Sequence, residues 1–134
     1  MVMMSDCVLD ASAVLAVLLR EPGAEVVRPH LPGAMISSVN VAEIINLRQK
    51  NGESLERNAQ VLRSLQLRIV DFDFEQAVIS ASFKPYARIA NLSLGDRACL
   101  SLGLLFNAPV LTAEHSWTKA DMGVQVRVIR PQTY

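Results

Sequence analysis

The sequence predicts an α/β protein in which a central, mainly parallel sheet is covered by helices on both faces. Short apolar runs alternate along the chain with longer segments of helical periodicity. Strands separated by helices pair in parallel, and such a sheet needs a layer on each face. No repeat, low-complexity tract or linker interrupts the 134 residues, so residues 1–134 are expected to form a single domain.

Five strands are predicted where apolar runs are too short for a helix. The first is "CVL", and the others are "AMISS", "RIVDF", "PVLTA" and "VQVRVI". They span residues 7–9, 34–38, 68–72, 109–113 and 124–129. The run after the first strand, "SAVLAVLLREPG" (12–23), predicts a helix that stops at Pro22 and the following glycine.

The remaining helices differ in the strength of their pattern. Residues 24–33 give a weak helix, whereas 40–52 have apolar side chains at helical spacing before a glycine stop. Two further helices are expected over 54–66 and 75–87. The segment "SLGDRACLSLGLLFN" (93–107) is apolar on nearly every side, as expected of a helix packed in the middle of a domain.

Composition narrows the function classes. Thirteen basic residues balance thirteen acidic ones, so there is no global basic field of the kind that announces nucleic-acid binding. Cys7 and Cys99 lie in apolar runs far apart, which predicts buried free thiols in a reducing cytoplasm. The start "MVMMSDC" lacks a basic leader region, and no window reaches the roughly 18 apolar residues of a membrane span.

Four carboxylates fall at equivalent places in this predicted sheet. Asp10 and Glu114 follow strands, whereas Glu43 and Asp96 lie near the start of helices. In a parallel α/β sheet these positions all lie at one edge, where sites form in the crevice beyond the strands. Carboxylates gathered there repel one another, and Mg²⁺ or Mn²⁺, which prefer hard oxygen ligands, would relieve the repulsion.

Each carboxylate also has a structural explanation. Ser93 and Asp96 have capping-box spacing, and so do Asn40 and Glu43. Asp10 could be an N-cap residue. The fourth acid, Glu114, could favour the N-terminus of a following helical turn.

Four segments in order resemble the PIN-domain ribonucleases, and most of all the VapC-type toxins of type II toxin–antitoxin pairs. They are "VLDASAVLAVL", "ISSVNVAEII", "LSLGDRACLSLG" and "VLTAEHSWTKADMGVQVRVI". The resemblance covers essentially the whole chain. It implies a PIN-like three-layer α/β/α sandwich, an RNA substrate, a cognate VapB-type antitoxin, a homodimer, and operator DNA bound only through the antitoxin, without a membrane partner.

The resemblance also implies roles for individual residues. The catalytic and metal-binding set would be Asp10, Glu43, Asp96 and Glu114. Supporting hydroxyls would be Ser12 and Thr112. The family's usual residue at the fourth acidic position is Asp, and the extra methylene of the Glu here moves the carboxylate by on the order of 1 Å, which matters for the strict octahedral geometry of Mg²⁺.

Other polar residues are expected to be structural. Trp117 and Asp121 match a continuation seen in many members of the family, and we expect the former to pack in the core and the latter to be a solvated or capping acid. His115 is expected to be solvated, and no partner histidine lies three or four positions from it or from His30.

Two functions follow as expectations. The first is a Mg²⁺- or Mn²⁺-dependent endoribonuclease that hydrolyses RNA phosphodiester bonds with a metal-activated water held in the acidic pocket. The alternative is a catalytically weakened PIN-like module that binds RNA or protein, because Glu114 has replaced the usual Asp.

Overall fold

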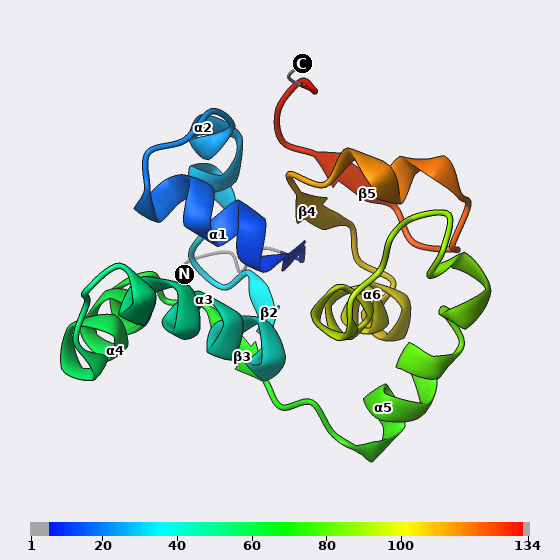
Figure 1. The fold of residues 1–134 in the computed structure, drawn as a ribbon, viewed down its shortest axis with the longest axis horizontal. Coiled ribbons are helices and arrows are strands. Elements are labelled where there is room, and N and C mark those ends of the chain that lie inside the picture. The colour runs from blue at the N-terminus through cyan, green and yellow to red at the C-terminus, as the bar shows by residue number, and fades with distance from the viewer. Residues whose placement is uncertain (1–5, 133–134) are drawn as a thin grey trace.

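The computed structural model describes residues 6–132 (Figure 1). The strands are β1 (Val8–Leu9), β2 (Met35–Ser37), β3 (Arg68–Val70), β4 (Val110–Thr112) and β5 (Val126–Val128). The α-helices are α1 (Ala11–Leu18), α2 (Ala24–Val27), α3 (Ser38–Lys50), α4 (Leu55–Ser64), α5 (Phe74–Ala81) and α6 (Leu94–Phe106). Short 3-10 helices are η1 (Arg28–His30), η2 (Lys84–Tyr86) and η3 (His115–Lys119).

The strands form one sheet in the order β3-β2-β1-β4-β5, and every neighbouring pair is parallel. The predicted α/β class and parallel sheet are therefore confirmed. Each strand is followed by at least one helix before the next strand begins, which is the connection that parallel pairing requires. The topology carries the carboxyl ends of all five strands to the same edge.

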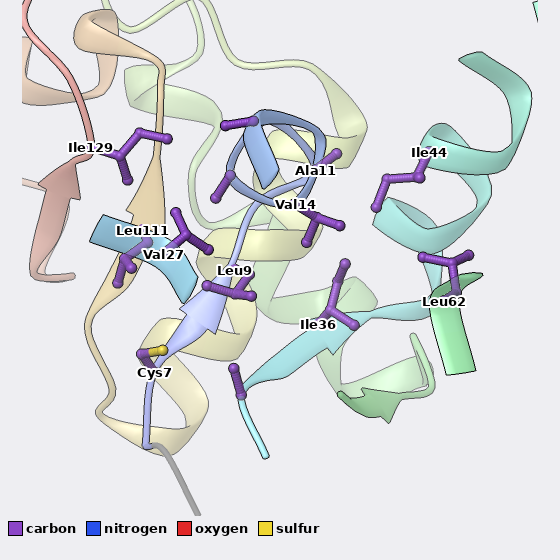
Figure 2. Packing of buried hydrophobic residues seen from close by; sticks show 13 residues of the cluster. Cys7, Leu9, Ala11, Val14, Val27, Ile36, Ile44, Leu62, Leu111 and Ile129 are labelled. Carbon is purple, nitrogen blue, oxygen red and sulfur yellow. The ribbon is translucent and has the colours of Figure 1, made fainter. Parts of the chain in front are cut away.

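Alternate residues of the strands point to two separate cores, as the pleat of a strand requires. Leu9, Ile36 and Leu111 face the first core, where α1 to α4 supply most of the remaining side chains. Figure 2 shows Leu9 and Ile36 near Val14 of α1, and Leu111 beside Val27 of α2.

The second core lies on the opposite face of the sheet. Val8, Met35 and Val110 face it, and α6 covers them with Cys99, Leu100 and Leu102 among others. In Figure 1 the helices α1 to α4 and the pair α5 and α6 accordingly lie on opposite sides of the strands. The result is the three-layer α/β/α sandwich that the sequence predicts.

The predicted end of the first helix was wrong. The first helix ends at Leu18, before Pro22, because Arg20 adopts a left-handed backbone with φ of 55° that breaks the helical hydrogen bonds. The chain then turns at Gly23, where a Cβ atom would approach within 2.8 Å of Ile129. Close packing of this turn against the chain after β5, rather than the proline, sets the helix end.

Two predicted single helices are broken. Residues 24–33 form the short α2 and then η1, because a proline follows within one turn. Likewise 75–87 divide into α5 and η2, again with a proline in the second piece. The other helices lie where the sequence places them, within a few residues.

Some predictions concern residues outside the described part of the chain. The N-terminal stretch in which no leader was found consists mostly of residues 1–5, and the expected domain of 1–134 also includes 133–134. Within residues 6–132, the helices are too short or too polar to cross a lipid bilayer.

Candidate active site

The site lies at the edge of the sheet where β1 and β4 end. Asp10 directly follows β1, and its backbone N–H donates to the carbonyl of Leu111 in β4 at 3.0 Å. The first turns of α3 and α6 meet at the same edge, where the Asn40 side chain donates to the Gly95 carbonyl at 3.0 Å. Four segments far apart in sequence thus converge, as expected beyond the carboxyl ends of parallel strands.

Asp10 is buried and is held through one oxygen only. Its Oδ2 accepts hydrogen bonds from the Ser12 hydroxyl at 2.7 Å and from the Thr112 hydroxyl at 3.0 Å. These hydroxyls in turn accept from the backbone N–H groups of Ala113 and Glu114, at 2.9 and 3.0 Å. The network fixes the carboxylate and the loop after β4, and it leaves Oδ1 without a hydrogen bond from the described residues. Asp10 occupies the N-cap position of α1, but its side chain makes no capping bond.

Glu43 lies one turn farther into α3 than the sequence suggests. The N-cap of α3 is Ser37, whose hydroxyl accepts from the backbone of Val39 at 3.2 Å, so the proposed capping box of Asn40 and Glu43 does not form. Instead, the Asn40 amide donates to Oε1 of Glu43 at 2.8 Å. The Glu43 carboxylate lies directly against Gly95 of α6, where a Cβ atom would overlap it.

Asp96 caps its own helix. Its Oδ2 accepts from the backbone N–H of Ser93 at 2.9 Å, and the Ser93 hydroxyl accepts from the backbone of Asp96 at 3.1 Å. The capping box that the spacing suggested is therefore present. No hydrogen bond within the described chain occupies Oδ1 of Asp96, so capping leaves half of this carboxylate available for a ligand.

Asp10 is affected electrostatically by the other two carboxylates. Burial raises the pKa of Asp10, the charges of Asp96 and Glu43 add to the rise, and the hydrogen bonds from Ser12 and Thr112 oppose it; the net result is a pKa of about 6 against the usual 3.8. Burial also raises the pKa of Asp96, against the hydrogen bonds from Ser93. The pKa of Cys99 is raised well above its usual range, mainly because the thiol is fully buried and secondly by these same charges.

Glu114 stands apart from this group. It is exposed, and neither of its carboxylate oxygens takes part in a hydrogen bond within residues 6–132. It lines a polar hollow of about 350 Å³ together with His115 and Arg130, among others. His115 is half-buried and its Nε2 lies 2.6 Å from the Arg130 carbonyl, so the expectation of a solvated histidine was wrong.

The donor set fits a hard divalent cation. Asp10, Glu43 and Asp96 each use one oxygen in a hydrogen bond with the protein and keep the other free of such bonds, and ligands oriented by a second set of partners show this pattern. As they stand, however, no three His, Cys, Asp or Glu side chains in the described chain are close enough to enclose an ion. Like charges repel, which keeps the carboxylates apart when no ion is present. Binding of an ion therefore requires these side chains to move closer together.

The remaining predicted residues are structural. Trp117 is buried in the second core, as expected. Asp121 is exposed and accepts from the backbone of Gly123 at 3.1 Å, which makes it a turn acid. Cys7 and Cys99 are buried and form no disulfide, also as expected.

Two residues of the site were missed from the sequence. The spacing predicts Asn40 only as the start of a capping box, and Gly95 lies in a predicted helix with no role assigned to it. The spacing of Asn40 and Glu43, three apart on one helix, was a usable signal, because such side chains are neighbours on a helical surface. The contact between Gly95 and Glu43 depends on how α3 packs on α6, and no local pattern reveals it.

Comparisons with known proteins agree with this fold. A family model described as "PIN domain" matches residues 7–122. No curated protein matches the chain at the sequence level.

Three solved structures superpose closely on the chain. DNA-bound VapBC from Salmonella typhimurium is 17% identical, with a TM-score of 0.68 over 94% of this chain and 98% of that chain. VapBC2 from Rickettsia felis, bound to a promoter DNA fragment, is 16% identical, with a TM-score of 0.68 over 91% of this chain and 97% of that chain. A toxin–antitoxin complex from Klebsiella pneumoniae is 16% identical, with a TM-score of 0.70 over 92% of this chain and 97% of that chain. At this identity the superpositions establish the shared fold.

Proposed function

Because the chain belongs to the PIN-domain family, we propose that it is a Mg²⁺- or Mn²⁺-dependent endoribonuclease, the VapC-type toxin of a toxin–antitoxin pair. The observation that carries the proposal is the acidic cluster at the sheet edge, in which Asp10, Glu43 and Asp96 each keep one oxygen free of protein hydrogen bonds. The family resemblance led us to expect these three acids together with Glu114, and PIN domains are in general nucleases.

Each residue of the cluster has a proposed role. Asp10, Glu43 and Asp96 hold the main ion, and Glu114 assists them or holds a second one. Ser12 and Thr112 orient Asp10 through their hydroxyls. When bound, the ion supplies Lewis-acid activation of a water and stabilises charge on the scissile phosphate. The proposed hydrolysis leaves a 5′-phosphate and a 3′-hydroxyl, and no side chain acts as a covalent nucleophile.

The structural neighbours support a proposal about partners. One is named as a toxin–antitoxin complex, and the other two are VapBC structures that contain DNA. We propose that an antitoxin inhibits this chain by placing a cationic side chain, typically arginine, among the carboxylates, where it compensates their charge as a metal does. Homodimers, and contact with operator DNA through the antitoxin, belong to the same proposal.

The nuclease proposal is tested by the substitution Asp96→Asn. We expect loss of Mn²⁺-dependent RNA cleavage with little change in Tm, because an Asn oxygen can still accept from Ser93 in the capping box. The matched control is Asp73→Asn, since Asp73 also caps a helix, accepting from the backbone of Gln76 at 2.9 Å, but lies at the start of α5. A fully active Asp96→Asn protein would refute the proposal.

A second candidate is a PIN-like module that binds RNA or protein without efficient catalysis. The observation that favours it is the isolation of Glu114, which is exposed and is absent from the charges that raise the pKa of Asp10. The substitution Glu114→Asp separates the two candidates. Cleavage that rises sharply in this variant would support the weakened module, whereas near-equal cleavage by both proteins supports the nuclease.

A further inference from the structure

We infer that Asn40 is a positioning residue, which holds the carboxylate of Glu43 against the first turn of α6 so that its free oxygen can reach a cation. The inference rests on the proposed metal site, to which it adds a residue that the sequence resemblance did not assign and that the capping pattern assigned only as a helix cap.

The first argument is the orientation of the Asn40 amide. The residue is fully buried, and its Nδ2 lies 2.8 Å from Glu43 Oε1 and 3.0 Å from the Gly95 carbonyl. Both neighbours can only accept hydrogen bonds. The amide must therefore turn its two N–H groups toward them, because the flipped orientation would place three acceptor oxygens together.

The second argument is that no other small side chain reproduces these two bonds. Ser or Thr has one hydroxyl hydrogen and can serve only one of the two acceptors. Asp has no hydrogen to donate when ionised, and it would add a charge beside Glu43. Asn is also a poor helix former, and Asn40 lies three residues after the N-cap Ser37 of α3, so local propensity does not explain its presence.

The third argument is the oxygen that Asn40 leaves unused. Within residues 6–132, its buried Oδ1 has no hydrogen-bond partner. Asn58 in α4, equally buried, shows the structural alternative: its amide donates to the Ser54 carbonyl at 2.9 Å and its Oδ1 accepts from Arg48 at 2.8 Å. An unsatisfied buried acceptor destabilises a fold. The Asn40 amide therefore donates to Glu43 in an orientation that leaves its own Oδ1 without a hydrogen bond in the described chain.

As a consequence, the two carboxylate oxygens of Glu43 have different roles. Oε1 is held by the amide, and the bare Cα of Gly95 leaves room for the carboxylate beside Asp96. Oε2 has no hydrogen bond within the described chain and remains for a ligand. Partners that orient a ligating carboxylate in this way typically contribute 10- to 100-fold to metal affinity.

The test is calorimetric titration of Mn²⁺ into the full chain without antitoxin. Asn40→Ala is expected to weaken Mn²⁺ binding by about tenfold or more. Asn58→Ala removes an equally buried amide away from the site, so it is expected to lower Tm while leaving Mn²⁺ affinity within about twofold of the parent protein. Equal affinities of Asn40→Ala and the parent protein would overturn the inference.

A double substitution shows whether Asn40 acts through Glu43. In a Glu43→Gln background, Asn40→Ala is expected to change Mn²⁺ affinity by less than about twofold, because the carboxylate that it positions is gone. A full additional tenfold loss would show that Asn40 acts otherwise. If Glu43→Gln alone leaves Mn²⁺ binding unchanged, the proposed metal site fails, and not merely the positioning role.

A folding defect does not prevent the test. If circular dichroism shows Asn40→Ala to be unfolded, Asn40→Ser takes its place; it keeps one donor, and its Mn²⁺ affinity is expected to lie between those of Asn40→Ala and the parent protein when all three fold. If both variants unfold while Asn58→Ala remains folded, Asn40 is a structural residue and the positioning role is overturned.

Discussion

Asp10 combines burial with an incomplete set of hydrogen bonds. The side chain belongs to a residue only 4% exposed, yet its two hydroxyl donors both contact Oδ2. A carboxylate in this position is destabilising unless further charge compensates it. The raised pKa, about 6, is the measurable sign that the metal-free fold holds this charge unfavourably. A divalent ion or a cationic side chain at Oδ1 would compensate the charge of Asp10 and so stabilise the ionised carboxylate.

The first prediction is that Asp10→Asn stabilises the metal-free protein at pH 7. The amide oxygen can accept from Ser12 and Thr112 as Oδ2 does, and the buried charge disappears. We expect a gain of about 1–3 kcal/mol in the free energy of unfolding, bounded by the size of the pKa shift. Urea denaturation in the presence of EDTA measures it, and a destabilised variant would mean that the charge is compensated within the metal-free fold.

The second prediction concerns pH. The folded protein keeps a proton on Asp10 up to about pH 6, whereas the unfolded chain loses it near 3.8. The folded state therefore binds more protons between these values, and this group's contribution to stability falls as pH rises through the window. The stability gap between Asp10→Asn and the parent protein should thus widen from pH 4 to pH 6.5 and be constant above it. A gap that does not vary with pH would contradict the raised pKa of Asp10.

At the scale of the element, α6 shows how one helix serves packing and site together. Its first turn is capped by Ser93 and Asp96, and its second and third turns bury Cys99 and Leu102 in the second core. Gly95 lies between these functions, at a position where alanine would ordinarily favour a helix by up to about 1 kcal/mol. The approach of Glu43 explains the glycine.

The third prediction follows from that approach. Gly95→Ala should fail to stabilise the protein, because the new methyl group must displace the Glu43 carboxylate. Mn²⁺ affinity should fall by roughly tenfold or more, as expected when a ligand loses its orientation. The control is Leu94→Ala, an exposed neighbour in the same turn, which should retain its affinity. A more stable Gly95→Ala protein with unchanged Mn²⁺ affinity would contradict this account of Gly95.

For the individual elements, the sequence predicted whether a segment is a helix or a strand better than it predicted the residues at which the element begins and ends. Apolar periodicity found every strand and most helices, since burial of one face is a property of the local pattern. It misjudged α1, whose end depends on a left-handed Arg20 and on the packing of Gly23 against Ile129. It also misplaced the start of α3, because Ser37 and Asn40 are both plausible caps until the strand before them is fixed.

At the scale of the molecule, the parallel topology explains why the site could be anticipated. Once the strands are parallel, their carboxyl ends share an edge, and acids that follow strands or begin helices gather there. This rule predicts that Asp10, Glu43 and Asp96 lie close together at that edge. It could not give the orientation of each carboxylate, because this depends also on contacts between elements, such as the Thr112 hydroxyl of β4 on Asp10 and Gly95 of α6 against Glu43.

The same topology makes the stability of the whole fold depend on what binds at the edge. Asp10 lies between β1 and α1, and the other two acids lie on α3 and α6, so their repulsion is shared among elements from both cores. A cation that binds the folded state alone stabilises it by mass action, by about 2.7 kcal/mol at a hundredfold excess over Kd. For a domain of this size that corresponds to a rise in Tm of roughly 10 °C.

The fourth prediction is therefore that Mn²⁺ raises the Tm of the parent protein by roughly this amount at such an excess, and that EDTA restores the lower value. Asp10→Asn should begin with a higher Tm and show little further rise, so the two melting curves approach each other as Mn²⁺ is added. Glu75→Gln, which removes an exposed acid of α5, should behave as the parent protein does. An equal rise in all three proteins would mean that the ion binds elsewhere. A rise confined to proteins with an intact Asp10 would instead link the strain of this buried carboxylate to the ion that relieves it.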